Sequence, residues 1–178
     1  MLYIGGCGTT GRHLALATEA RCGNKGGMQL DDAATILGRA DFFEICDAEQ
    51  RRLLAFASER KKFRPNSVIY SAGDMPEGAH VLVSGTVSST QEGAENNPFL
   101  IHDVGSVLGA MGLVIAKPRP VTIKAIDAVE TLFVPRTAFM KLAKQYPDLA
   151  GRAADRIRRE LTGYLGAIEE ARGRFRKG

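Results

Sequence analysis

The chain has 178 residues, 44% of them hydrophobic and 25% charged, which is the composition of one ordinary folded domain with an appendage. Its formal net charge is +4, and no apolar run approaches the ~20 residues that span a bilayer, so we expect no membrane partner. The three cysteines form no CxxC pair, and no basic stretch precedes an apolar one at the N-terminus, so the sequence predicts a cytoplasmic protein without a disulfide framework, zinc site or secretory signal.

Residues 1–27 are glycine-rich and differ in composition from the rest of the chain. Within them, the segment Gly6–Gly11 fits GxGxxG, the fingerprint of a dinucleotide-binding enzyme, after an apolar stretch. The second strand with an acidic end, which such a site needs about 20 residues further on, is missing from CGNKGGMQLDD. We therefore predict a flexible extension here, with Met28 as the start of the functional chain.

The next part of the sequence predicts two helices. Asp31 or Asp32 can cap a short helix that stops at Gly38. Asp47 and Gln50 have the spacing of a capping box, in which each residue bonds the backbone of the other at a helix start. The stretch that follows, EQRRLLAFASERKKF, carries an apolar stripe, and we expect it to form one helix over its whole length.

After these helices the hydrophobic period changes to about two. Turn residues at Gly73-Asp74, Ser84-Gly85 and Gly93 separate stretches rich in Val, Ile, Thr and Phe. These stretches read SVIYSAG, HVLVSGTVSS, NPFLIHDVG and VTIKAIDAVETLFVP. Many short strands with regular turns predict a mainly β fold with flanking helices, built as an antiparallel jelly-roll β-barrel. The barrel domain, with its N-terminal helices, is predicted to span residues 28–146.

A helix over RTAFMKLAKQY is predicted to end the barrel domain, and the remaining residues 147–178 are predicted to form a long amphipathic helix that begins at Pro147 and a basic tail. The basic residues near its end suit the negative end of the helix dipole. Gly163 and Gly166 each lower the stability of a helix by about 1 kcal/mol relative to alanine. They indicate either a close approach of two helix backbones or fraying of the helix end. The apolar stripe is too long for one barrel to cover, so we predict a homodimer through residues 149–168. The stripe consists of Leu149, Ala153, Ile157, Leu161, Tyr164 and Ile168.

The stretch GSVLGAMGLVIAKPRPVT is predicted to bind an anion. Gly105 fits a turn, and Gly109 and Gly112 flank a place where the backbone comes close to something. A short helix from Ala110 to Ala116 would present free amides at its start, which is a ready anion site. Arg119 follows Pro118 and can pair with a phosphate through two hydrogen bonds.

These residues resemble the phosphate-binding cassette of the cyclic nucleotide-binding domains, including the effector domain of catabolite activator and other Crp/Fnr-like regulators. The family pattern is roughly F-G-E-x-A-L, a hydrophobic residue, x-x-x-P-R-A-A-T, and this chain aligns without a gap as LGAMGLV, then PRPVTIKA. Upstream, Gly73-Asp74 and LVSGTV look like the family's turn and strand pair. The resemblance covers about residues 36 to 170, and it implies the jelly-roll fold.

The resemblance also implies roles for individual residues. In the family, the glycine and its neighbouring amides hold the cyclic phosphate and the arginine neutralises it, which points to Gly109 and Arg119. The glutamate that accepts a hydrogen bond from the ribose 2′-hydroxyl is replaced by Ala110, and the small residue after the arginine by Pro120. The predicted ligand-binding residues are Gly109, Ala110, Met111, Gly112, Leu113, Arg119, Pro120 and Thr122.

Three functions stay open. The first is a regulatory module that senses cAMP or cGMP at low affinity, or another phosphorylated ligand, and signals to an unknown effector protein through its C-terminal helix. The second is a vestigial pocket on a dimerisation or interaction scaffold. The third is an enzyme with a dinucleotide at residues 6–11, which we disfavour because no catalytic residues or metal ligands stand out and His13, His80 and His102 are scattered. We expect no direct DNA binding, because a recognition helix does not fit after the long helix.

Overall fold

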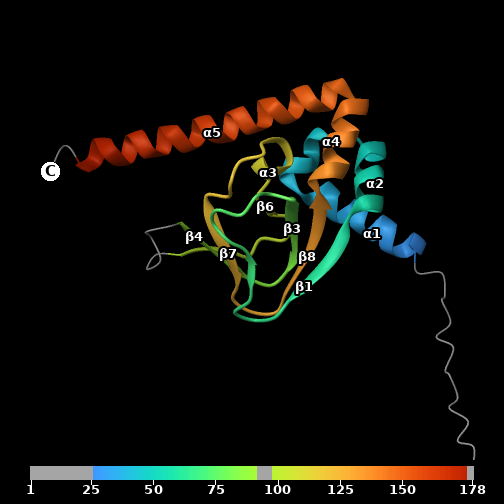
Figure 1. Ribbon diagram of the computed structural model, residues 1–178, viewed down its shortest axis with the longest axis horizontal. Coiled ribbons are helices and arrows are strands. Elements are labelled where there is room, and N and C mark those ends of the chain that lie inside the picture. Colours follow the sequence, from blue (N-terminus) through green and yellow to red (C-terminus); the bar gives the residue numbers. More distant parts are fainter. Residues whose placement is uncertain (1–25, 92–97, 176–178) are drawn as a thin grey trace, which may run out of the picture.

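The computed structural model describes residues 26–91 and 98–175. Two four-stranded antiparallel sheets form the jelly roll, and helices gather at one end of it (Figure 1). The strand order is β1-β8-β3-β6 in one sheet and β2-β7-β4-β5 in the other. The predicted mainly β fold with flanking helices is therefore confirmed. The strands are β1 (Glu59–Phe63), β2 (Val68–Tyr70), β3 (Gly78–Ser84), β4 (Val87–Gln91), β5 (Phe99–Ile101), β6 (Val107–Leu108), β7 (Val121–Ala125) and β8 (Val129–Pro135).

Helices precede the barrel, interrupt it once and follow it. α1, α2 and α4 pack on one another, and α5 leaves this group and passes over α3 (Figure 1). The long C-terminal helix begins at Pro147, as predicted, because proline suits the first turn of a helix. The helices are α1 (Gly26–Arg39), η1 (Asp41–Ile45), α2 (Ala48–Ala57), α3 (Met111–Val114), α4 (Arg136–Gln145) and α5 (Pro147–Phe175).

The apolar side chains form two separate cores. The first lies between the helices and the sheet that contains β3 and β8, and its largest fully buried side chains include Phe42, Phe43 and Phe139. The second lies between the two sheets and includes Leu82 and Ile123. The barrel therefore has its own interior, while one of its faces is covered by helices.

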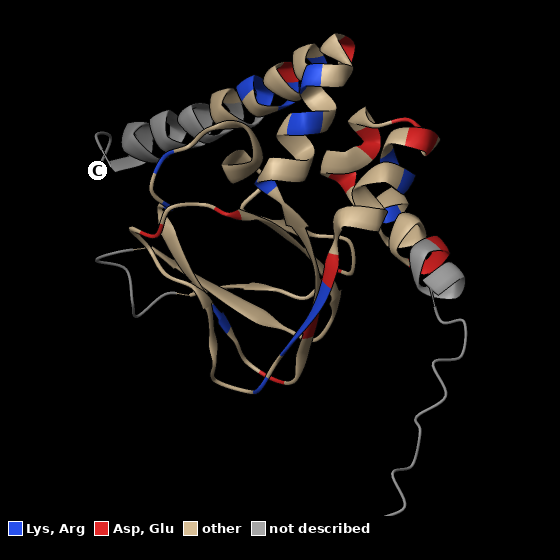
Figure 2. Cartoon of the chain, turned by 45° about the vertical axis from the view of Figure 1, so that its right-hand side comes forward, with Lys and Arg blue, Asp and Glu red and all other residues tan. Residues whose placement is uncertain are grey.

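The start of α2 agrees with the sequence, and its end does not. The Asp47 side chain accepts from the Gln50 amide at 2.8 Å, and the Gln50 side chain accepts from the Asp47 amide at 3.1 Å, so the predicted capping box is confirmed. The helix ends at Ala57, however, and Glu59–Phe63 pairs with β8 as an edge strand. The basic positions of this strand are blue in the cartoon of Figure 2, and such charges are common on exposed sheet edges.

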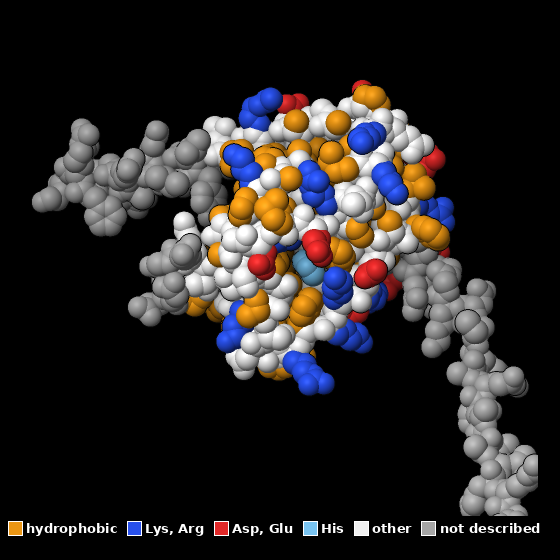
Figure 3. All heavy atoms as spheres, in the orientation of Figure 1, with side chains coloured by type: hydrophobic (Ala, Val, Ile, Leu, Met, Phe, Trp, Pro, Cys, Tyr) orange, Lys and Arg blue, Asp and Glu red, His pale blue; other side chains and the backbone are white. Residues whose placement is uncertain are grey.

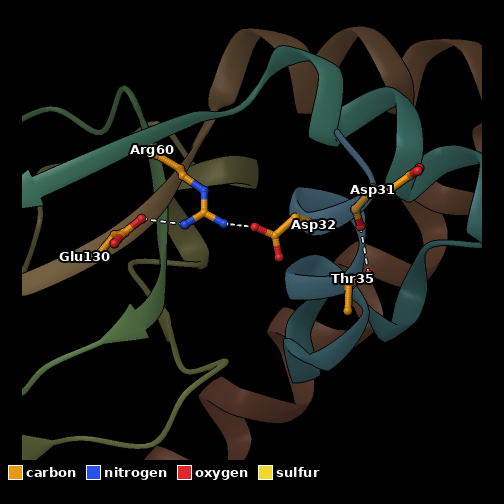
Figure 4. A network of polar contacts seen from close by, with 5 residues as sticks. All are labelled: Asp31, Asp32, Thr35, Arg60 and Glu130. Carbon is orange, nitrogen blue, oxygen red and sulfur yellow. Dashed lines mark hydrogen bonds and ion pairs between the residues drawn. The ribbon is translucent and has the colours of Figure 1, made fainter. Parts of the chain in front are cut away.

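The prediction that Asp31 or Asp32 caps the first helix is wrong, because α1 begins at Gly26 and both residues lie inside it. Asp32 has another partner there. Arg60 of β1 bridges Asp32 to Glu130 of β8, so one guanidinium joins α1 to the sheet (Figure 4). The carboxylate of Asp32, which the sequence predicted as a helix cap, therefore forms an ion pair with Arg60.

The predicted extension over residues 1–27 lies almost wholly outside the described residues, as do the segment Gly6–Gly11 and the turn at Gly93. The hypotheses of a flexible extension, of Met28 as the functional start and of a dinucleotide site stay predictions.

Candidate functional site

The predicted anion-binding stretch lies beside the barrel, where α5 passes over α3 (Figure 1). A cavity of about 450 Å³ opens there, which is within the range of small-molecule sites. Figure 3 shows hydrophobic side chains gathered below α5 on this face, with Lys and Arg side chains at their margin. The structure brings six of the eight predicted residues to the cavity: Gly109, Ala110, Met111, Gly112, Arg119 and Pro120.

Arg119 is packed into the fold beside the cavity and is 9% exposed. Its Nη2 donates to the Gly78 carbonyl at 2.7 Å, and its guanidinium carbon lies 3.7 Å from the centre of the Tyr70 ring. Its backbone is also fixed, because its amide donates to the Asp74 carbonyl and its carbonyl accepts from the Gly73 amide, both at 2.9 Å. The predicted anion clamp is therefore held in one position by β2, β3 and the turn between them.

Gly109 is required by this arrangement. Its φ of +76° is in the left-handed region that glycine favours. A Cβ on Gly109 would lie 2.1 Å from Nη1 of Arg119, so a side chain would displace the guanidinium. Gly112 is similarly constrained, because a Cβ there would lie 2.6 Å from Cβ of Pro76. The two glycines let the cassette approach the arginine on one side and the turn before β3 on the other.

The cassette helix is shorter than predicted, since α3 covers Met111–Val114 and the backbone is extended from Ile115. The residue before a proline avoids helical geometry, so the helix could not continue through Lys117, although it already ends three residues earlier. The Gly112 amide donates to the Gly109 carbonyl at 2.9 Å and is therefore occupied. The amides of Gly109, Ala110 and Met111 stay candidates for holding an anion.

Leu113 and Thr122, the other two predicted residues, do not line the cavity. Leu113 is fully buried in the core between the helices and the sheet. The Thr122 hydroxyl accepts a hydrogen bond from the Ala72 amide at 2.9 Å and so fixes the turn after β2. Both residues hold the cassette in place, which a sequence pattern does not distinguish from contact with a ligand.

A second cavity of about 480 Å³ shares Tyr70 and Arg119 with the first and is lined by His80. His80 is buried, as the sequence reading of an ordinary core residue allows, and its Nδ1 lies 3.0 Å from the Thr131 hydroxyl. Burial, followed by the charges of Lys61 and Arg119, lowers the pKa of His80 to about 3. Burial also raises the pKa of Tyr70, although Arg119 opposes that shift. At pH 7 His80 and Tyr70 are therefore both neutral, and both line the second cavity together with Arg119.

Sequence reasoning missed Tyr70, Gly78 and Leu161 as parts of this site. Tyr70 sits in an ordinary strand, and Gly78 contributes its carbonyl, which no side-chain pattern reveals. The sequence did mark Leu161 as an apolar residue that needs a partner surface, because it belongs to the apolar stripe of α5. It lines the cavity, whereas the sequence assigned it to a dimer.

Comparisons with known proteins find relatives of this chain. Residues 60–146 match the family described as cyclic nucleotide-binding domain. Lysophospholipase nte1 of Aspergillus terreus is 26% identical over 117 residues, which are 60% of this chain and 8% of that protein. The chain thus spans less than a tenth of the length of the curated relatives it matches.

Solved structures share the fold. A cyclic nucleotide-binding-like protein from Brucella abortus is 29% identical with a TM-score of 0.54, and the match covers 64% of this chain and 99% of that one. The cAMP-bound chain PfPKA-R has a TM-score of 0.66 at 20% identity, with 83% of this chain and 49% of that one covered. At that identity the second likeness shows the fold alone.

Within residues 26–91 and 98–175, no group of three or more His, Cys, Asp or Glu side chains could hold a metal ion. In the same part of the chain, no helix combines the length and apolar character that crossing a membrane requires.

Proposed function

Because the chain contains a cyclic nucleotide-binding domain at residues 60–146, we propose that it is a regulatory module whose cavity binds a small phosphorylated ligand and whose α5 passes the signal on. The observation that carries the proposal is the position of Arg119, a buried cation at the wall of a cavity that Leu161 of α5 also lines. A ligand held there touches both the cassette and the output helix.

We propose that cAMP and cGMP bind weakly. Ala110 lines the cavity where the family's glutamate would accept the ribose 2′-hydroxyl, and alanine has no acceptor. Losing a hydrogen bond to a charged group costs roughly 1.5–3 kcal/mol, or roughly 10- to 150-fold in affinity. A hydroxyl left buried without a partner would add to the loss.

Two contacts support signalling through α5. Leu161 lines the cavity directly, and Leu113 of α3 packs in the same core as Leu149 and Ile157 of α5. The helix is also anchored near its start, where Arg156 pairs with Asp41 of η1 at 3.1 Å. A shift of α3 on ligand binding would therefore reach α5 through packed side chains.

The same packing restricts the proposed homodimer. Leu149, Ala153 and Ile157 are 0–4% exposed within one chain, so they are not free to pair with a second copy. Leu161 is 42% exposed, whereas Tyr164 and Ile168 lie where side chains are not described. We therefore propose that any pairing uses the stripe from Leu161 onward, and that the output partner is a second copy or an effector protein in the cytoplasm.

Titration calorimetry with cAMP and cGMP tests the proposal on the full chain and on Ala110→Glu. We expect weak or silent binding by the wild-type chain and a roughly 10- to 150-fold gain for the variant. Binding by the wild-type chain as tight as by the variant would contradict the role given to Ala110. If neither the wild-type chain nor the variant binds cAMP or cGMP, the result favours the second candidate function.

That second candidate is an interaction scaffold with a vestigial cavity. The position of Arg119 favours it, because the Gly78 carbonyl and the Tyr70 ring already satisfy the guanidinium in the absence of an anion. It predicts that no nucleotide raises the melting temperature, while the oligomeric state or a protein partner still depends on the exposed part of α5.

A further inference from the structure

The lining of the 450 Å³ cavity points to a ligand class, and this inference rests on the proposed function of the cavity as an anion site. We infer that the cavity takes an organic anion with an apolar body, namely an alkyl or aryl phosphate or carboxylate, in preference to a nucleotide. The charge would face Arg119, and the apolar body would lie along α3 toward α5.

The side chains of the lining offer few hydrogen bonds. Among the described residues, fourteen line the cavity, and of these only Tyr70, Lys117 and Arg119 have a nitrogen or oxygen in the side chain. The remaining residues are apolar or glycine, and they include Ile115 and, from α5, Leu161. Small-molecule sites usually orient a polar ligand with a few well-placed polar groups. The polar side chains of this lining are two cations and one phenol.

A nucleotide fits this lining poorly. Its base and ribose carry several hydrogen-bonding atoms, and each one that is buried without a partner costs free energy. Ala110 replaces the carboxylate that the resemblance assigns to the ribose, and Pro120 provides no amide hydrogen. An alkyl or aryl group has no such atoms, so burying it against the same residues is favourable.

The charges of the lining favour an anion. Arg119 and Lys117 are the two cations among the described lining residues, and no Asp or Glu belongs to that set. Gly109 lets the cassette backbone come close to Nη1 of Arg119, because a Cβ there would lie 2.1 Å from that nitrogen. Lys117 is exposed in the segment after α3, where it can attract the anion without being part of the buried contact.

A homologous series tests the inference with compounds of known size. Butyl, hexyl and octyl phosphate, the carboxylates of the same chain lengths, and cAMP are titrated into the full-length protein, below the concentrations at which the longer compounds aggregate. We expect affinity to rise about fourfold for each added CH₂ group that is buried, and octyl phosphate to bind more tightly than cAMP. Comparison of the two series shows which anionic head is preferred. Octanol and octyltrimethylammonium are expected to bind at least tenfold more weakly.

Two variants connect the result to this cavity. Ala110→Glu is expected to weaken the binding of octyl phosphate, because a carboxylate enters the apolar lining. The same variant is expected to strengthen the binding of cAMP, because the carboxylate can accept a hydrogen bond from the ribose. Leu161→Ser is expected to flatten the dependence on chain length while leaving butyl phosphate almost unchanged. Leu161 is 42% exposed, so this variant is expected to fold.

The outcomes separate this inference from the proposed function. Tighter binding of cAMP than of octyl phosphate, or affinity that does not rise with chain length, overturns the apolar-anion inference and leaves the proposed function intact. Equal binding of octanol and octyl phosphate overturns the requirement for an anion. Failure of cAMP and of every alkyl anion to bind overturns both.

Discussion

The two sides of the cavity differ in how the fold holds them. On one side, Arg119 is fixed by a hydrogen bond to Gly78, by the Tyr70 ring and by its own backbone. On the other side, Ala110 and Pro120 face the cavity as small or rigid residues, and Pro120 is exposed. We call these the packed side and the open side. The difference implies that changes on the packed side alter both stability and binding, whereas changes on the open side alter binding alone.

The strongest test of the packed side is Arg119→Gln. We expect the free energy of unfolding to fall by about 2–3 kcal/mol, because the variant loses the contact with the Tyr70 ring and a charge-assisted hydrogen bond to Gly78. Anion binding should fall roughly 30-fold or more. Urea unfolding and calorimetry measure the two effects.

Lys117→Gln is the matched control, because it removes a cation from the same lining at an exposed position. It should leave stability unchanged and weaken anion binding only slightly. Equal loss of stability in both variants would show that Arg119 is not fixed as its contacts indicate.

Gly109→Ala tests the backbone of the packed side. We expect a loss of about 1–3 kcal/mol in unfolding free energy, because alanine at a φ of +76° is strained and its Cβ would meet Nη1 of Arg119. Anion binding should weaken in parallel. Gly151→Ala is a suitable control, since Gly151 lies in α5 with no atom within 4 Å of an added Cβ, and it should be neutral or stabilising.

The pH dependence of stability tests His80, which lies behind Arg119. Its pKa in the fold is about 3, below the ordinary value of 6.5, so the unfolded chain binds the proton more readily. The stability that depends on a neutral His80 is therefore fully present above pH 6.5, and it is lost progressively as the pH falls toward 3. Between pH 7 and 5.5 we expect a loss of about 1 kcal/mol.

Chemical denaturation at several pH values measures this loss, and His80→Gln should remove it from the profile. An unchanged profile in the variant would mean that other groups cause the acid sensitivity.

The smallest effect is expected at a site that belongs to neither side. Arg60→Gln removes the bridge between Asp32 and Glu130 (Figure 4). All three side chains are partly exposed, so the loss should stay below about 1 kcal/mol, and anion binding should not change. A change in ligand affinity here would show that stability and binding are coupled outside the packed side.

Much of this fold follows from local patterns. The capping box at Asp47, the turns at Gly73 and Gly85 and the start of α5 at Pro147 each depend on neighbours in sequence, and each appears as predicted. The strand at Glu59–Phe63 does not follow from a local pattern, because ERKKF has no alternation of apolar and polar residues. It forms a strand through its pairing with β8.

The candidate site could be predicted only in part. The spacing of Gly109 and Arg119 indicated an anion site, and the structure places the two in contact. Whether a residue faces a cavity or a core depends on three-dimensional packing, and so Leu113 and Thr122 were assigned to the ligand when they support the cassette. Tyr70 could not be found, because its stacking on Arg119 joins segments distant in sequence.

The structural role of Arg119 also has an evolutionary consequence. A residue that contributes to folding is retained by selection for abundance, even in a lineage whose ligand has changed. The side chains of Ala110 and Pro120 have no hydrogen-bonding atoms, so drift or a new ligand can replace them at a smaller cost in stability. A Pro-Arg pair at this position in another sequence would then indicate common descent of the barrel. It would not identify the present ligand, which would have to be inferred from the residues on the open side of the cavity.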